Sequence, residues 1–196
     1  MNMNHQEPFD PSLWKCLRHP RRQSKAFDAT NPTRDNLPYG TWFWLAIIAV
    51  GGTNTYSLSL GVALGVSPSS YFIFPLALSA GIAWCCFSLV VARETERNLL
   101  SVEHVCLVTM AFGEAVLLPT AALNFLGHFP GNISPAAFNS IAVIVSNLAM
   151  LIAMACQLRE LDIPIWKTVA MWFLILDPFG IILFLFFVQL LKGGTP

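Results

Sequence analysis

Two acidic residues, Glu114 and Asp177, lie in long apolar stretches of the sequence, and two amides, Asn54 and Asn147, lie in two other such stretches. An acidic side chain that is buried in lipid without a counter-ion favours its neutral, protonated form. That form can donate a hydrogen bond to a neighbouring helix, or it can release its proton when a cation binds. The sequence therefore leaves two kinds of chemistry open: hydrogen bonding between helices, and the handling of protons or cations.

The composition indicates what kind of chain positions these residues. Of the 196 residues, 55% are hydrophobic and only 11% are charged, and the mean hydropathy is +0.60. Ordinary soluble domains contain about 25% charged residues. These values exclude a water-soluble globule, a disordered chain and a nucleic-acid-binding protein.

Five apolar stretches are each long enough for the ~20 residues that a membrane-spanning helix needs. The predicted spans are residues 41–64, 71–92, 104–127, 136–158 and 164–191. The fifth is the longest, and we expect it to tilt, or to bend at Pro178, to fit the bilayer. A closed β-barrel needs alternating apolar and polar residues, which these nearly continuous apolar runs lack. The predicted fold class is all-α: a polytopic membrane protein with a bundle of five transmembrane helices.

The domain organisation follows from these spans. A basic, Pro-rich tail covers residues 1–40, the transmembrane domain covers 41–191, and a short outer tail covers 192–196. Ten of the eleven Lys and Arg residues fall on one side of this topology, and Lys192 falls on the other. Because Lys and Arg are in excess in cytoplasmic loops, we expect a cytoplasmic N-terminus and an outer or lumenal C-terminus. The expected location is the bacterial inner membrane.

With this orientation, the four polar residues fall in one layer near the middle of the bilayer. At 1.5 Å per residue, Glu114 lies about 15 Å and Asp177 about 20 Å from the cytoplasmic ends of their spans. Asn54 and Asn147 are also central in theirs, and no Lys or Arg falls in the layer. Since the carboxyl groups lack an obvious counter-ion, we expect at least one of them to be protonated at neutral pH.

The tail combines apolar and basic residues within a short segment. A short amphipathic turn or helix would place Trp14 among lipid headgroups and the neighbouring cations over anionic lipid. Each such cation contributes about 1 kcal/mol to binding. The candidate lipid-docking residues are Trp14, Lys15, Arg18, Arg21, Arg22 and Lys25. The alternatives are that these charges only set the topology, or that the tail binds a protein partner.

Motifs that mark common enzymes are absent from the sequence. It contains no His-Glu-x-x-His zinc motif, no Gly-rich phosphate loop and no Gly-x-Ser-x-Gly elbow. The five cysteines fall in the tail or in the cytoplasmic halves of the spans, where we expect small buried side chains rather than disulfides. We therefore predict a non-enzymatic protein with no catalytic residue, no cofactor and no metal site.

The arrangement of tail and spans resembles the Yip-type (Ypt-interacting) family of five-span membrane proteins, in its bacterial-like branch. The resemblance covers most of the chain and rests on the tail pattern Leu13-Trp14-x-x-Leu17-x-x-Pro20 leading to Phe27, the charged stretch 93–103, and the link 158–164 before a long last span. The Asp-Leu-Tyr-Gly-Pro-like motif of the eukaryotic members, which are associated with Rab-type GTPases, is absent from this tail.

The resemblance implies a non-enzymatic protein that acts through protein or lipid contacts in membrane organisation or a trafficking-like role. The expected partners are the lipid bilayer, anionic lipid headgroups, and other membrane proteins or a second copy of this chain. The intramembrane carboxylates support an alternative: a small proton- or cation-coupled transporter or channel subunit. A transporter would need Glu114 and Asp177 for activity, whereas a scaffold would need them only for stability.

Overall fold

The computed structural model describes residues 8–65, 70–127, 129 and 133–193, with the backbone alone at 70–74 and 190–193. These residues form helices, short turns and connections, and the described part of the chain contains no strand. Three short elements come first: α1 (Leu13–Arg18), α2 (Pro20–Ala29) and the 3-10 turn η1 (Arg34–Asn36).

Five long helical segments follow. They are α3 (Tyr39–Ala63), α4 (Ser70–Thr95), α5 (Leu99–Leu126), α6 (Pro135–Glu160), and a fifth segment made of α7 (Ile165–Met171), the π-helical η2 (Trp172–Leu176) and α8 (Asp177–Gly193). Each segment is long and apolar enough to cross a membrane. The predicted fold is thus confirmed: the chain is a five-helix, all-α bundle and a multi-pass integral membrane protein.

The second connection is shorter than the predicted charged loop at 93–103. α4 continues to Thr95, and α5 already begins at Leu99. Asn98 determines this start, because its side chain accepts a hydrogen bond from the N–H of Leu100 (3.0 Å) and so caps the helix. Hydropathy alone does not detect such a cap, and the helix therefore begins before residue 104, the first residue of the predicted third span.

At the other ends of the spans, glycines terminate two helices. Gly65 after α3 and Gly127 after α5 both have a φ of +66°, a left-handed conformation that favours glycine. The predicted outer tail 192–196 begins inside α8, which runs to Gly193, and residues 194–196 lie outside the described residues.

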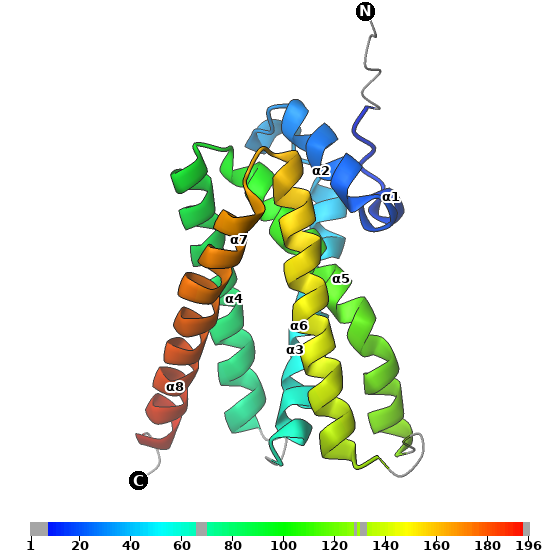
Figure 1. The fold of residues 1–196 in the computed structure, drawn as a ribbon, viewed down its shortest axis with the longest axis vertical. Coiled ribbons are helices and arrows are strands. Elements are labelled where there is room, and N and C mark those ends of the chain that lie inside the picture. Colours follow the sequence, from blue (N-terminus) through cyan, green and yellow to red (C-terminus); the bar gives the residue numbers. More distant parts are fainter. Residues whose placement is uncertain (1–7, 66–69, 128, 130–132, 194–196) are drawn as a thin grey trace, which may run out of the picture.

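The long helices pack in two groups that share a core. α3, α5 and α6 pack against one another, and α4 packs along α8 (Figure 1). α4 also contacts α3, α5 and η2, and α7 contacts α6, so the two groups are joined. Buried side chains from α4, α5, α6, α7 and η2 form the shared core, among them Phe87, Val102, Met154, Leu158 and Trp172, whereas Leu45 of α3 belongs to a second cluster.

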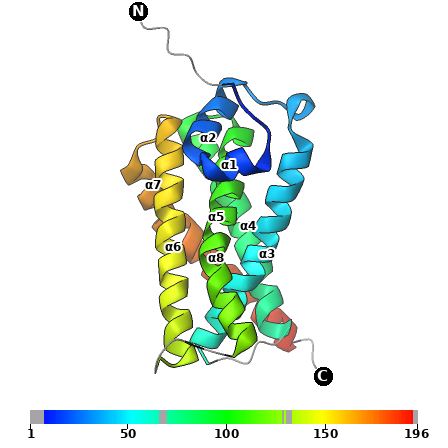
Figure 2. The ribbon, with the colours of Figure 1, turned by 90° about the vertical axis from the view of Figure 1, so that its right-hand side faces the viewer.

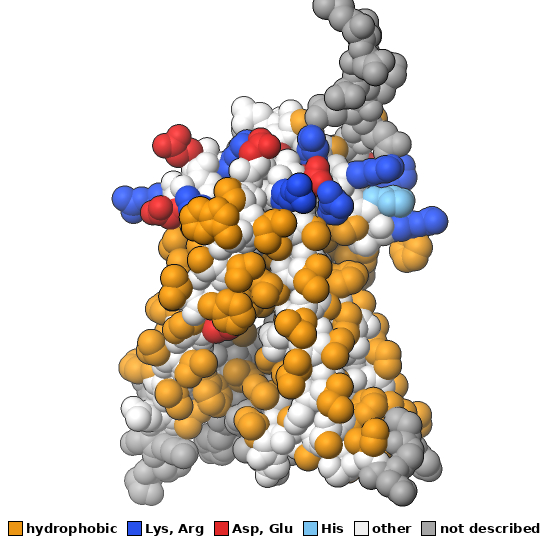
Figure 3. All heavy atoms as spheres, viewed as in Figure 1, with side chains coloured by type: hydrophobic (Ala, Val, Ile, Leu, Met, Phe, Trp, Pro, Cys, Tyr) orange, Lys and Arg blue, Asp and Glu red, His pale blue; other side chains and the backbone are white. Residues whose placement is uncertain are grey.

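Charged side chains gather at one end of the bundle, which we call the charged end (Figure 3). It comprises the connections 96–98 and 161–164 together with α1 and α2. The C-terminus of α8 lies at the opposite end (Figure 1). Apolar side chains cover most of the surface between the two ends, as lipid contact requires (Figure 3).

Residues 8–37 fold over the charged end and form a unit that we call the N-terminal cap (Figure 2). α2 packs on α5 and α6, and α1 packs on α3 and α5. Phe27 is fully buried in this contact. Leu13 and Leu17, the two leucines of the tail pattern, pack inward against a cluster that includes Leu45 of α3. The predicted tail is therefore a folded part of the bundle.

Candidate functional site

A cavity of about 590 Å³ lies between the long helices. Residues from α3, α4, α5, α6, η2 and α8 line it, so all five spans contribute to its wall. Most of that wall is apolar. The polar side chains that line it are Glu114, Asp177, Asn147, Tyr56, Thr53, Ser79 and Ser146. Among the described residues, the lining includes two carboxylic acids and no Lys, Arg or His.

The structure brings three of the four predicted layer residues to this cavity: Glu114, Asn147 and Asp177. Asn54 is not part of the lining. Its side chain is exposed and donates a hydrogen bond to the carbonyl of Val50 in its own helix (3.1 Å). A helix turns by about 100° per residue, so Asn54 points roughly opposite to Gly52, which lines the cavity two positions earlier. The two residues nevertheless lie at a similar level along α3.

Glu114 lies where α5 comes closest to α3. Its carboxyl group rests against Gly51 and Gly52, and a Cβ atom added at Gly52 would lie only 2.7 Å from the Cβ of Glu114 and 2.8 Å from its Oε2. Oε2 is buried and has no hydrogen-bond partner within the described part of the chain. The absence of a side chain at Gly52 therefore makes room for an acidic group whose Oε2 atom has no hydrogen-bond partner among the described residues.

Asn147 is held in place by a residue that the sequence analysis missed. Its Nδ2 donates hydrogen bonds to the hydroxyl of Tyr56 on α3 (2.8 Å) and to the carbonyl of Val143 (3.1 Å). Tyr56 lies one helical turn beyond Gly52, on the same face of α3. The four-residue spacing of Gly52 and Tyr56 was visible in the sequence and could have indicated that both residues lie on the face of α3 that lines the cavity.

Asp177 begins α8 directly after the π-helical segment η2. Pro178 has no N–H, and in a regular α-helix its ring would collide with the carbonyl of Leu174. A π turn is wider and avoids this collision, and such turns recur at functional sites. The irregularity that we expected at Pro178 therefore begins one turn earlier. No hydrogen-bond or ion-pair partner of the Asp177 carboxyl is found among the described residues.

The candidate lipid-docking residues all belong to α1 and α2. Trp14 is 69% exposed. Two of the cations are held in ion pairs, Lys15 with Asp10 (2.9 Å) and Arg21 with Glu160 of α6. The Glu160 carboxylate raises the pKa of Arg21 by hydrogen bonding to its guanidinium. The remaining three candidates, Arg18, Arg22 and Lys25, are exposed.

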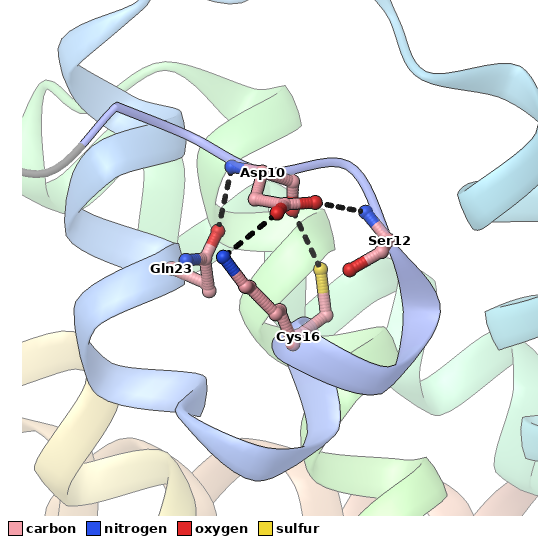
Figure 4. Close-up of polar contacts among 5 residues, drawn as sticks. Asp10, Ser12, Cys16 and Gln23 are labelled. Atoms are coloured by element: carbon pink, nitrogen blue, oxygen red, sulfur yellow. Dashed lines mark hydrogen bonds and ion pairs between the residues drawn. The ribbon is translucent and has the colours of Figure 1, made fainter.

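The start of the cap is tied together by a network around Asp10 (Figure 4). The N–H of Asp10 donates to Gln23 Oε1 (3.0 Å), and the carboxylate of Asp10 accepts from the N–H of Ser12 (2.9 Å). The bonds from Lys15 and Ser12 lower the pKa of Asp10 to about 2. The thiol of Cys16 points to the carbonyl of Asp10, and its burial raises the pKa of Cys16 to about 11.

A second set of contacts joins the cap to the bundle. Ser24 of α2 donates to Oε1 of Gln157 on α6 (3.0 Å), and Nε2 of Gln157 donates to the hydroxyl of Thr109 on α5 (3.1 Å). All three side chains are buried. Nearby, the rings of Phe27 and His104 lie 4.6 Å apart. The cap is thus joined to α5 and α6 by specific buried contacts.

Comparisons with protein-family models, curated proteins and solved structures find no match to this chain.

Proposed function

We propose that this protein is a small proton- or cation-coupled transporter, which binds a cation in the cavity and releases a proton in exchange. One observation supports this proposal above the others: Glu114 on α5 and Asp177 on α8 line the same cavity, and neither carboxyl group has a side-chain partner in the described residues. When both acids are protonated, the cavity is neutral. Loss of one proton as one cation binds leaves its net charge unchanged, which avoids the cost of an unpaired charge in a low-dielectric site.

The alternative, that the acids only join helices, is less consistent with the contacts. Other polar side chains make the bonds between spans: Asn147 bonds Tyr56, Ser146 donates to the carbonyl of Gly113 (3.1 Å), and Asn124 and Asn139 bond each other (2.8 and 3.0 Å). A protonated carboxyl used for the same purpose would show a similar partner.

For the orientation, we propose that the charged end is cytoplasmic, with the N-terminus inside and the C-terminus outside or lumenal, in the bacterial inner membrane. The excess of Lys and Arg at that end supports this choice.

A non-enzymatic, Yip-like role through protein or lipid contacts is the second candidate function. The exposed Trp14 beside exposed Arg18 and Arg22 favours it, because these side chains are free to reach lipid headgroups or a partner at the charged end.

The proposed transport is tested with the purified full chain in proteoliposomes that enclose a pH-sensitive dye. An imposed gradient of a monovalent cation or an amine should drive proton flux in the opposite direction. Asp177→Asn and Glu114→Gln should abolish this flux while the free energy of unfolding changes by less than about 1 kcal/mol, since neither carboxyl bonds another side chain in the described residues. Asn54→Asp places an acid at the same depth outside the cavity and serves as the control. Equal flux from wild type and Asp177→Asn would refute the proposal.

A further inference from the structure

We infer that the ligand of the cavity is a hydrophobic organic amine, a protonated amino group on an apolar body, which enters sideways from the membrane between α6 and α8. The inference rests on the proposed function, because it uses the same two carboxyl groups. Three features carry it: the size of the cavity, the composition of its wall, and the position of its mouth.

The size of the cavity does not suit a bare metal ion. Mg²⁺ and Ca²⁺ require about six or more oxygen ligands at roughly 2.0–2.6 Å, and the described residues contain no group of three or more His, Cys, Asp and Glu side chains that could hold a metal. The volume of about 590 Å³ instead matches the pockets of roughly 300–1,000 Å³ that bind organic molecules. An ion alone would leave most of this space unfilled.

The wall suits a ligand with an apolar body and one cationic group. Aliphatic side chains such as Leu60 and Leu117 form much of it, and Trp84, Trp172 and Phe173 add aromatic surface. The two indole rings meet edge to face, with centroids 5.6 Å apart. Aromatic rings attract organic ammonium groups, and the attraction grows when water is excluded. The apolar part of an amine would thus replace lipid or water against this surface.

The mouth of the cavity opens on the side of the bundle. Four exposed lining residues flank this side: Ile144 and Leu148 on α6, Phe173 in η2, and Ile181 on α8. α8 packs mainly on α4 and η2 rather than on α6, which leaves this side uncovered. Figure 3 shows acidic atoms at mid-height of the apolar surface, on the face that α6 and α8 share.

The exposed Leu64 at the end of α3 also lines the cavity, so the opening extends toward the end of the bundle opposite the charged end.

In a membrane, α6 and α8 border acyl chains at this depth, and a ligand that reaches the mouth must first dissolve in the bilayer. A hydrophobic amine does so in its neutral form. It can then accept the proton of Glu114 or Asp177 inside the cavity, where the N–H bond forms as the O–H bond breaks and an ammonium–carboxylate pair results. When the ammonium form leaves to water on one side, the carboxylate takes up a proton from that water, which restores the neutral carboxyl group and completes the exchange of one cation for one proton.

The chemical class is tested with radiolabelled octylamine and the full chain in lipid nanodiscs, with empty nanodiscs subtracted as background. Octylamine should bind saturably, and unlabelled octylamine should displace it, whereas octanol and methylamine should not. Asp177→Asn should weaken binding by about tenfold or more, the usual effect of removing one partner of a buried charge pair. The control Asn54→Asp should leave binding within about twofold. Equal displacement by octanol would mean that the amino group is not recognised and would overturn the inference.

The mouth is tested with two matched pairs of substitutions on its rims. Ile181 (60% exposed) lines the cavity, whereas its neighbour Ile182 (62% exposed) does not. Likewise Leu148 (54% exposed) lines it and Ile152 (62% exposed), one turn further along α6, does not. Ile181→Trp and Leu148→Trp should slow octylamine association by about tenfold by narrowing the mouth, while Ile182→Trp and Ile152→Trp should leave it within about twofold. Equal rates in all four variants would overturn entry between α6 and α8.

The outcomes separate this inference from the proposed function. If methylamine or an inorganic cation drives carboxylate-dependent proton flux and octylamine does not bind, the transport proposal holds and the ligand class is wrong. If octylamine binds in a carboxylate-dependent way without any proton flux, the ligand class holds and transport is wrong. If octylamine neither binds nor drives flux, and no other cation does, both are overturned.

Discussion

The side chain of Glu114 lies directly over the bare backbone of Gly52, so close that a Cβ atom there would be 2.7 Å from the Cβ of Glu114. This contact joins α3 to α5 at the wall of the cavity. The position of the Glu114 carboxyl group therefore depends on Gly52, a residue without a side chain.

Gly52→Ala should therefore displace Glu114 and destabilise the bundle by about 1–3 kcal/mol, the usual cost of overpacking a tight contact. Unfolding in mixed micelles with increasing denaturing detergent measures this change. Gly81→Ala on α4 is the matched control, because an added Cβ there meets nothing within 4 Å. It should be neutral or stabilising by up to about 1 kcal/mol, since alanine has the higher helix propensity. Equal stability of Gly52→Ala and wild type would contradict the close contact.

Ser24→Ala should loosen the cap, because Oε1 of the buried Gln157 loses its hydrogen-bond donor. An unsatisfied buried acceptor costs about 1–3 kcal/mol. Hydrogen exchange in α2 should accelerate accordingly, while exchange in α8 stays the same. Thr30→Ala is the control, since Thr30 is an exposed residue whose hydroxyl donates to the carbonyl of Phe27 in its own turn. Protection of α2 that is unaltered by Ser24→Ala would show that this bond does not hold the cap.

Opening of the cap should become easier as the pH rises from about 9 to 11. Burial raises the pKa of the Cys16 thiol from 9.0 to about 11. Between these values the open cap loses the thiol proton and the docked cap keeps it, so a higher pH favours the open form. A variant that retains Cys16 as its one cysteine should react slowly with iodoacetamide at pH 8. The ratio of the free-thiol reaction rate to the Cys16 reaction rate should fall as the pH rises from about 9 to 11. A rate at pH 8 equal to that of a free thiol would refute burial of Cys16.

Among the basic residues of the cap, Arg18 and Arg22 should contribute more to lipid contact than Arg21, whose guanidinium is held by Glu160. In nanodiscs with brominated anionic lipid, quenching of Trp14 is obtained from the difference between wild type and Trp14→Phe. Replacing Arg18 and Arg22 by Ala should reduce this quenching, and Arg21→Ala should reduce it less. The differences should shrink at high salt, because screening weakens the attraction. No preference of wild type for anionic over neutral lipid would rule out lipid docking.

Reporter fusions test the proposed orientation. A reporter that is active only outside the cytoplasm should be active when fused after Gly65 or Ile133, and silent when fused after Glu96 or Asp162, because the second pair lies at the charged end. The reverse pattern would place the charged end outside.

The five spans could be predicted from hydropathy because membrane thickness sets a minimum length that few other segments reach. The level of each polar residue along its helix was predictable for the same reason, since it follows from residue counts along a straight helix. The direction of each side chain was not, as Asn54 and Tyr56 illustrate: both are polar and central in α3, but only Tyr56 lines the cavity. Which face of a helix is inward depends on its neighbours, and their arrangement is not encoded in composition.

For a related reason, the folding of the N-terminal cap could not be predicted from the sequence. Its apolar residues are few and stand among cations, so the segment reads as a solvated tail. Only the three-dimensional arrangement places Phe27 against His104, and Ser24 against Gln157, which lies 133 positions later in the chain.

That separation has a consequence for biosynthesis. The cap leaves the ribosome before the spans, but its docking surface on α5 and α6 is complete only after Gln157 has been made. Until then, Ser24 has no acceptor on α6, and the face of α2 that packs on α6 remains exposed in the compartment where synthesis takes place. A segment that is translated before all five spans is thus among the last to dock completely, and a truncated chain that ends before α6 would expose a face of α2 to quality-control proteases.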